Sequence, residues 1–148
     1  MKGMEQGVSG GCFCGKIKFV ATSAPRFAYH CHCSDCRRIN GTAFHTGVVV
    51  NSADFRVTQG EPATFVCQAD SGHTITRWHC ADCGTQLFSV TTADPTITSL
   101  KAGALTSVPH EDIEPTLQIF WDSRVHWADA PKSLKPYAAG LRGQTPLT

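Results

Sequence analysis

Three cysteines, two histidines and two arginines lie together near residue 35, and the cysteines are spaced C-x-C-x-x-C. The thiols belong to Cys31, Cys33 and Cys36, and Arg37 and Arg38 follow directly. Thiolates this close together bring several sulfur ligands to one point, and sulfur is a ligand that zinc prefers. The spacing therefore predicts a metal site, and we take this stretch as the centre of the protein's chemistry.

Two further cysteine pairs lie on either side of this group. Cys12 and Cys14 form a C-x-C between glycines, and Cys80 and Cys83 form a C-x-x-C-G. Two pairs far apart in sequence can close one tetrahedral four-cysteine site, which is the usual form of structural zinc. The three-cysteine group would then hold a second ion with one tetrahedral position left open, as catalytic zinc is usually held.

A second division of the thiols is also open. Cys33 and Cys36 could combine with Cys80 and Cys83 as a zinc ribbon, although the 43 residues between these pairs exceed the about 15–20 that are typical. That division would leave the three other grouped cysteines without a site, so the spacing favours four plus three. Cys67 stands outside every group, and we expect it to be a buried free thiol.

The composition limits the classes of protein to consider. The chain has 148 residues, 41% of them hydrophobic, which suits one domain with a single core. Its net charge is +1, and no basic stripe indicates nucleic-acid binding. No apolar run approaches the about 18 residues of a membrane span. No signal-peptide pattern is visible at the start, so we expect a cytoplasmic protein with reduced thiols.

Short alternating segments and frequent turn residues must position the cysteines, and they predict an all-β protein. A short helix over residues 34–40 should end at Gly41, and C-x-x-C-G should occupy a turn between strands, as in a zinc knuckle. Residues 1–8 are expected to be a loose tail, and residues 121–148 to wrap the surface. The predicted strands cover residues 16–22, 26–30, 47–50, 55–59, 64–68, 73–78, 85–90, 96–102 and 116–120.

The three cysteine motifs occur in an order that resembles a known family. The chain reads G-G-C-F-C-G at 10–15, C-H-C-S-D-C-R-R-I-N-G-T-A-F at 31–44 and R-W-H-C-A-D-C-G-T at 77–85. Q-I-F-W-D-S-R at 118–124, with Trp127 after it, adds to the match. The chain resembles the glutathione-dependent formaldehyde-activating (GFA) enzymes, a family that includes the centromere protein V domain.

The resemblance implies a fold, a division of the cysteines and a reaction. The fold would be a β-tent of small antiparallel sheets with zinc knuckles, as one domain over 1–148 with its core at about 9–138. Two zinc ions per chain are implied, a structural one at the four-cysteine site and a reactive one at Cys31, Cys33 and Cys36. The founding activity of the family is the condensation of glutathione with formaldehyde, which gives S-(hydroxymethyl)glutathione. The ligands of the structural zinc would be Cys12, Cys14, Cys80 and Cys83.

Zinc held by three thiolates carries one net negative charge, so it should hold a substrate sulfur better than it activates water. This chemistry favours a carbon–sulfur lyase or synthase that joins a thiol such as glutathione to a small aldehyde. Same-fold enzymes with another thiol or electrophile, and a non-catalytic zinc module that binds a partner, are the alternatives. One of the nearby histidines could transfer the proton of the reaction or act as a fourth zinc ligand. The candidates are His30, His32 and His45.

Glutathione has two carboxylates, and arginines beside the three cysteines could bind them. Arg37 and Arg38 are the first candidates, because a guanidinium can form two parallel hydrogen bonds to a carboxylate. The weaker candidates are Arg77, Lys101 and Arg124.

Overall fold

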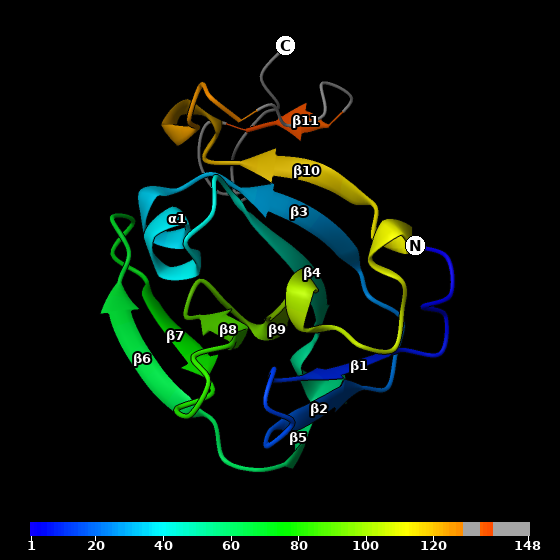
Figure 1. The fold of residues 1–148 in the computed structure, drawn as a ribbon. Helices are drawn as coiled ribbons and strands as arrows, with labels where there is room; N and C mark the ends of the chain where they lie inside the picture. Colours follow the sequence, from blue (N-terminus) through cyan, green and yellow to red (C-terminus); the bar gives the residue numbers. More distant parts are fainter. Residues whose placement is uncertain (129–133, 138–148) are drawn as a thin grey trace.

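The computed structural model describes residues 1–128 and 134–137 (Figure 1). Most elements within these residues are strands, as the sequence predicts. The strands are β1 Val8–Gly11, β2 Lys18–Ala21, β3 Phe27–Cys31, β4 His45–Asn51, β5 Phe55–Gln59, β6 Ala63–Gln68, β7 Thr74–His79, β8 Gln86–Thr91, β9 Asp94–Lys101, β10 Pro115–Ile119 and β11 Lys135–Pro136. The helical segments are α1 Ser34–Asn40 and the 3₁₀ turns η1 Ser52–Asp54, η2 Ala102–Ala104, η3 His110–Asp112 and η4 Trp121–Ser123.

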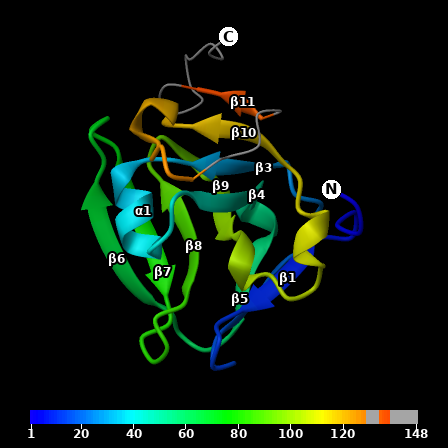
Figure 2. The same cartoon turned by 45° about the horizontal axis from the view of Figure 1, so that its top comes forward.

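The strands form two sheets. The smaller has the order β1-β2-β5, and the larger has the order β11-β10-β3-β4-β9-β8-β7-β6. Most pairs are antiparallel, but β10 runs parallel to both β3 and β11. The second sheet is therefore larger than the small antiparallel sheets that the family resemblance implies, and it is mixed. It bends around α1, which lies inside the curve between β6–β7 and β3 (Figures 1 and 2).

The hydrophobic core lies between the small sheet and one face of the large sheet. Directly paired residues point to the same face of a sheet, and Phe88 pairs with Leu100, which pairs with Val48. All three are buried in the main hydrophobic cluster. Phe19 of β2 packs edge-on against Phe88, with ring centroids 6.1 Å apart. This layer fixes the large sheet in place and leaves its opposite face for α1.

The opposite face of the large sheet carries polar and sulfur-bearing side chains. Cys31 pairs with His45, and Lys101 pairs with the residue two positions beyond His45. Arg77 of β7 pairs with Ser89 of β8, which pairs with Ser99 of β9, two positions before Lys101. These side chains share one face by the two-residue period of a strand. The fold thus gathers a thiol and three basic side chains under α1.

Several local predictions are confirmed by the structure. β5 has the predicted bounds, and β6 and β7 form the predicted hairpin. Helix α1 ends where Gly41 adopts φ 63°, a left-handed conformation that glycine enters without strain.

The predicted loose tail at residues 1–8 is wrong in part. Met4 is 1% exposed and Val8 is 2% exposed, and both belong to the core. The tail predicted over residues 121–148 contains η4 and β11, and residues 129–133 and 138–148 lie outside the described part. Among the described residues, no helix is long and apolar enough to cross a bilayer.

Candidate metal centres

Four sulfur atoms from the two outer cysteine pairs converge in one place. Cys12, Cys14, Cys80 and Cys83 place their sulfurs within 4.8 Å of one another. The sulfur of Cys14 lies 3.5 Å from that of Cys12 and 3.7 Å from that of Cys80. An ion with four tetrahedral sulfur bonds of about 2.3 Å needs sulfurs about 3.8 Å apart. The cluster therefore has the dimensions of a closed four-thiolate metal site.

Contacts between the two loops hold this four-cysteine cluster together. The hydroxyl of Thr85 accepts a hydrogen bond from the backbone of Phe13 at 3.1 Å, and it lies 3.2 Å from the sulfur of Cys83. Hydrogen bonds, first of all from the Thr85 hydroxyl, lower the pKa of the Cys83 thiol to about 5. Lys16 and Asp82 form an ion pair across the same loops. A thiolate is thus favoured at Cys83 even before an ion binds.

The second cluster consists of Cys31, Cys33 and Cys36, whose sulfurs also lie within 4.8 Å of one another. Cys31 ends β3, Cys33 is the N-cap of α1, and Cys36 lies in the first turn of that helix. Among the described residues, no histidine or carboxylate joins these three sulfurs. Within the described part of the chain, the cluster therefore offers three protein ligands, one fewer than a closed tetrahedral site needs.

The three thiols of this cluster compete for protons. Hydrogen bonds from Cys31 and Cys33 lower the pKa of the Cys36 thiol to about 3. The same contacts, first the one with Cys33, raise the pKa of Cys31 well above its usual value. One sulfur can therefore ionise easily, but three negative sulfurs this close repel one another. A divalent cation would remove that repulsion, so the donor set fits a metal ion.

Two of the nearby histidines have partners away from the three sulfurs. His32 is 2% exposed, and its Nε2 lies 3.0 Å from the side-chain oxygen of Gln118. His30 places Nδ1 3.0 Å from the hydroxyl of Thr46. Burial lowers the pKa of His30 to about 4, so its neutral form is favoured. Both imidazoles are therefore held by the fold beside the cluster, without joining its sulfurs.

The third histidine lies beside a buried lysine. The Nε2 atom of His45 is 3.3 Å from Nζ of Lys101, and the two side chains are 5% and 6% exposed. Burial lowers the pKa of both groups. Lys101 and Arg77 each favour the charged form of the Cys36 thiol electrostatically. The underside of the three-cysteine cluster is thus lined by basic groups.

The arginines next to the cluster have different surroundings. Nη1 of Arg37 donates hydrogen bonds to the backbone oxygens of His32, at 2.5 Å, and Ser123. Arg37 therefore ties α1 to η4. Arg38 is exposed, and Arg124 stacks its guanidinium on the Trp121 ring at 4.4 Å. A role of Arg37 or Arg38 in substrate binding stays a prediction.

A pocket of about 570 Å³ opens where β4 begins and β9 ends. His45 and Lys101 line it on the side of the three-cysteine cluster, and Thr85 lines it on the side of the four-cysteine cluster. Phe44 contributes an aromatic wall, and its ring centroid lies 4.4 Å from that of His30. The pocket is large enough for a small organic molecule. Sequence reasoning named His45 and Lys101, but it could not place them in one cavity.

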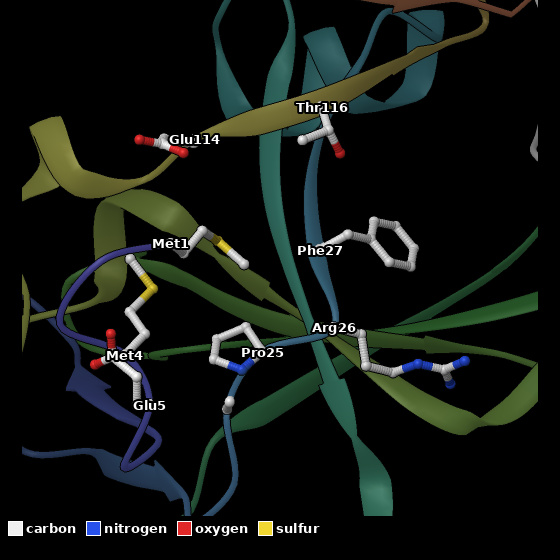
Figure 3. Close-up of a pocket in the computed structure, with 9 residues that line it drawn as sticks. Met1, Met4, Glu5, Pro25, Arg26, Phe27, Glu114 and Thr116 are labelled. Atoms are coloured by element: carbon white, nitrogen blue, oxygen red, sulfur yellow. The ribbon is translucent and has the colours of Figure 1, made fainter.

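A second pocket, of about 290 Å³, lies among residues of the N-terminal segment, of β3 and of β10. Figure 3 shows the side chains of Met1, Met4 and Pro25 close together in it, while the guanidinium of Arg26 extends away from them. Its wall combines apolar residues with Glu5, Arg26, Glu114 and Thr116, and it carries none of the predicted site residues. We therefore place the candidate chemistry at the larger pocket.

Comparisons with known proteins were made for the fold and for the family. A search of the curated proteins gave no match. A solved structure of a Rhodobacter sphaeroides protein from the Northeast Structural Genomics effort is similar, with a TM-score of 0.58 and 22% sequence identity. The similarity covers 74% of this chain and 98% of that chain, and it supports the fold alone.

The family model for glutathione-dependent formaldehyde-activating enzymes matches residues 7–123. This range includes all seven clustered cysteines and most of the described strands. The match therefore covers the greater part of the chain and both candidate metal centres. The chain belongs to the glutathione-dependent formaldehyde-activating enzyme family.

Proposed function

We propose that the protein is a zinc-dependent carbon–sulfur lyase or synthase. It would join a thiol such as glutathione to formaldehyde or a similar small aldehyde, and it would also catalyse the reverse reaction. One observation carries the proposal: three clustered thiols have no fourth ligand among the described residues, and His45, which pairs with Cys31 across β3 and β4, lines a pocket together with Lys101. Family membership supports this reading.

The two clusters would have different roles. Four thiolates complete a tetrahedral shell, so the four-cysteine cluster would hold structural zinc between the N-terminal loop and the β7–β8 turn. Zinc at Cys31, Cys33 and Cys36 would stabilise a substrate sulfur as thiolate and so supply a nucleophile near neutral pH. The cytosol is the proposed compartment, because all eight cysteines are free thiols and reduced surroundings keep them so.

The residues of the chain would orient the reactants. Phe44 and His30 form an aromatic wall of the pocket, and the basic groups below the cluster would favour a bound anion. Arg37 keeps the helix that carries Cys36 against η4. A carbonyl carbon would then have to approach the substrate sulfur from the pocket side.

Exchange NMR at equilibrium tests the proposal, because glutathione and formaldehyde also combine without a catalyst. With ¹³C-formaldehyde, we expect the zinc-loaded protein to increase the exchange rate between free aldehyde and adduct. Cys33→Ser should abolish the increase. Cys67→Ser, outside both clusters, should retain it. An exchange rate unchanged by the wild-type protein would reject the glutathione–formaldehyde reaction, and other thiol–aldehyde pairs or a partner-binding role would be tested next.

A further inference from the structure

Lys101 is a buried cation that the two candidate metal centres do not use as a ligand. Its Nζ atom lies 3.3 Å from Nε2 of His45. An ammonium group can only donate hydrogen bonds, so Nε2 accepts and the ring proton of a neutral His45 must be on Nδ1. The backbone register fixes the pair further, because both residues lie on the β4–β9 part of the sheet. His45 is therefore a positioning residue for the Lys101 ammonium.

No carboxylate neutralises this ammonium in the part of the chain that the structure describes. The ion pair found there joins Lys16 and Asp82, in the loops of the four-cysteine cluster, and does not involve Lys101. Arg77, a second buried cation at 3% exposure, has the sulfur of Cys67 as its hydrogen-bond partner at 2.6 Å. Two buried cations without a carboxylate are costly unless other negative charge is close.

The three-cysteine cluster supplies only part of that negative charge. Three thiolates around a divalent ion leave one net negative charge, whereas Lys101 and Arg77 bring two positive charges. One more anion in the pocket would balance the buried charges. The proposed reaction offers two such anions, the substrate thiolate and the alkoxide that forms from the aldehyde oxygen.

Lys101 is the cation that can reach this second anion. It lines the 570 Å³ pocket together with His45, whereas Arg77 is not among the lining residues. Lys101 is also the one lysine or arginine among the described residues that line the pocket. The three cysteines are not among the lining residues, but His45 pairs with Cys31, so an aldehyde at this end of the pocket would lie between the cluster and the Lys101 ammonium.

We propose that Lys101, positioned by His45, is the catalytic acid and base for the aldehyde oxygen, an inference that depends on the proposed function. As the substrate sulfur forms its bond to the carbonyl carbon, the π electron pair of C=O moves to oxygen. The alkoxide takes a proton from the Lys101 ammonium, and the amine regains a proton from solvent. In the reverse direction, the amine accepts the hydroxyl proton while the carbon–sulfur bond breaks.

The environment of Lys101 suits this exchange. Burial lowers its pKa, while the negative charge of Cys36 opposes that decrease. A general acid works best when its pKa is closer to the working pH, because it must both give up and regain a proton. An exposed lysine such as Lys18 lacks this environment.

Three variants test the inference by exchange NMR, with zinc content and melting temperature measured on each. Lys101→Met should keep two zinc ions and an unchanged or higher melting temperature, since a buried charge is replaced by an apolar chain of similar length. Its exchange rate should decrease by about 100-fold or more, the usual loss when one donor to a developing oxyanion is removed. Lys18→Met is the matched surface control and should exchange at the wild-type rate.

Lys101→Arg separates charge from proton transfer. Arginine keeps the positive charge but does not give up its proton. The variant should therefore still bind glutathionesulfonate, whose sulfur group is a fixed anion, more tightly than S-methylglutathione, whose sulfur group is uncharged. Its exchange rate should nevertheless be low. If either Lys101 variant exchanges within about threefold of the wild type, the role of Lys101 is overturned while the proposed function stands. If the wild type itself does not accelerate exchange, both proposals fail.

Discussion

The sulfur of Cys33 accepts a hydrogen bond from the backbone N–H of Cys36 at 3.2 Å, so one candidate metal ligand also caps the helix that carries another. The first N–H groups of a helix lack partners within the helix, and an N-cap side chain satisfies one of them. The geometry of the three-cysteine cluster is therefore set by helix formation as well as by any bound ion.

Substitutions of Cys33 should separate these two roles. Cys33→Ser keeps a capping oxygen but lacks the soft ligand, whereas Cys33→Ala lacks both. We expect each variant to bind one zinc per chain instead of two. Cys33→Ala should be less stable than Cys33→Ser by about 0.5–2 kcal/mol, the usual value of an N-cap. Elemental analysis and urea unfolding measure the two effects, and equal stabilities would show that the cap is unimportant.

The four-cysteine cluster should be the more important one for stability. It joins residues that are far apart in sequence, so losing its metal removes a cross-link as well as local bonds. We expect Cys80→Ser to lower the free energy of unfolding by more than about 4 kcal/mol, in the exceptional range for one substitution. Cys67→Ser is the control and should change it little. Thermal unfolding of Cys80→Ser and Cys33→Ser, with and without a chelator, compares the two clusters. An equal loss of stability in both variants would contradict this order.

Arg37 should prove structural, whatever it contributes to substrate binding. Arg37→Ala removes one hydrogen bond from α1 to Ser123 of η4 and one to the backbone of His32, just before α1, and we expect the free energy of unfolding to fall by about 1.5–3 kcal/mol, typical of bonds to a charged donor. Arg38→Ala, at an exposed neighbour, should cost less than about 0.5 kcal/mol. If Arg38→Ala instead weakens glutathione binding with unchanged stability, its predicted contact with a carboxylate is supported.

Asp54 should make stability depend on pH in the acid range. Hydrogen bonds from Ser23, at 2.6 Å, and Asn51, at 3.0 Å, lower the pKa of its carboxyl group. Because the folded pKa lies below the unfolded value of about 3.9, the stabilisation is present above that pH and is lost as the pH falls through the folded pKa. Asp54→Asn should therefore be less stable to unfolding than the wild type near pH 7, and this difference in stability should shrink below about pH 4.

Urea unfolding of both proteins at several pH values measures this difference in stability. Asp70→Asn, in the exposed β6–β7 turn, controls for the loss of one surface charge. A difference between Asp54→Asn and the wild type that stays constant down to pH 3 would show that the ionised carboxylate contributes nothing specific.

Local signals in the sequence account for much of the fold and for both cysteine clusters. Thiol spacing is a local property, and the C-x-x-C-G turn between β7 and β8 and the helix end at Gly41 follow from neighbouring residues. Alternation of polar and apolar residues identified β5 with its full bounds. The burial of Met4 was missed because a methionine among glycines and charged residues has no periodic pattern.

Long-range relationships were out of reach of the sequence. The parallel pairing of β10 with β3, which places Leu117 opposite Tyr29, has no local signature. The contact between Lys101 and His45 likewise depends on the register of β9 against β4. Both depend on how the large sheet is assembled, and residues that meet only through such pairing give no sign of it in the chain order.

The two clusters also differ in when a ribosome would complete them. All three thiols of one cluster have been synthesised once residue 36 is made, whereas the other needs residue 83. At roughly 5–20 residues per second, the second set is finished several seconds after the first. The thiols of the cluster proposed to be reactive are therefore available to a metal ion while the cluster proposed to be structural still lacks Cys80 and Cys83.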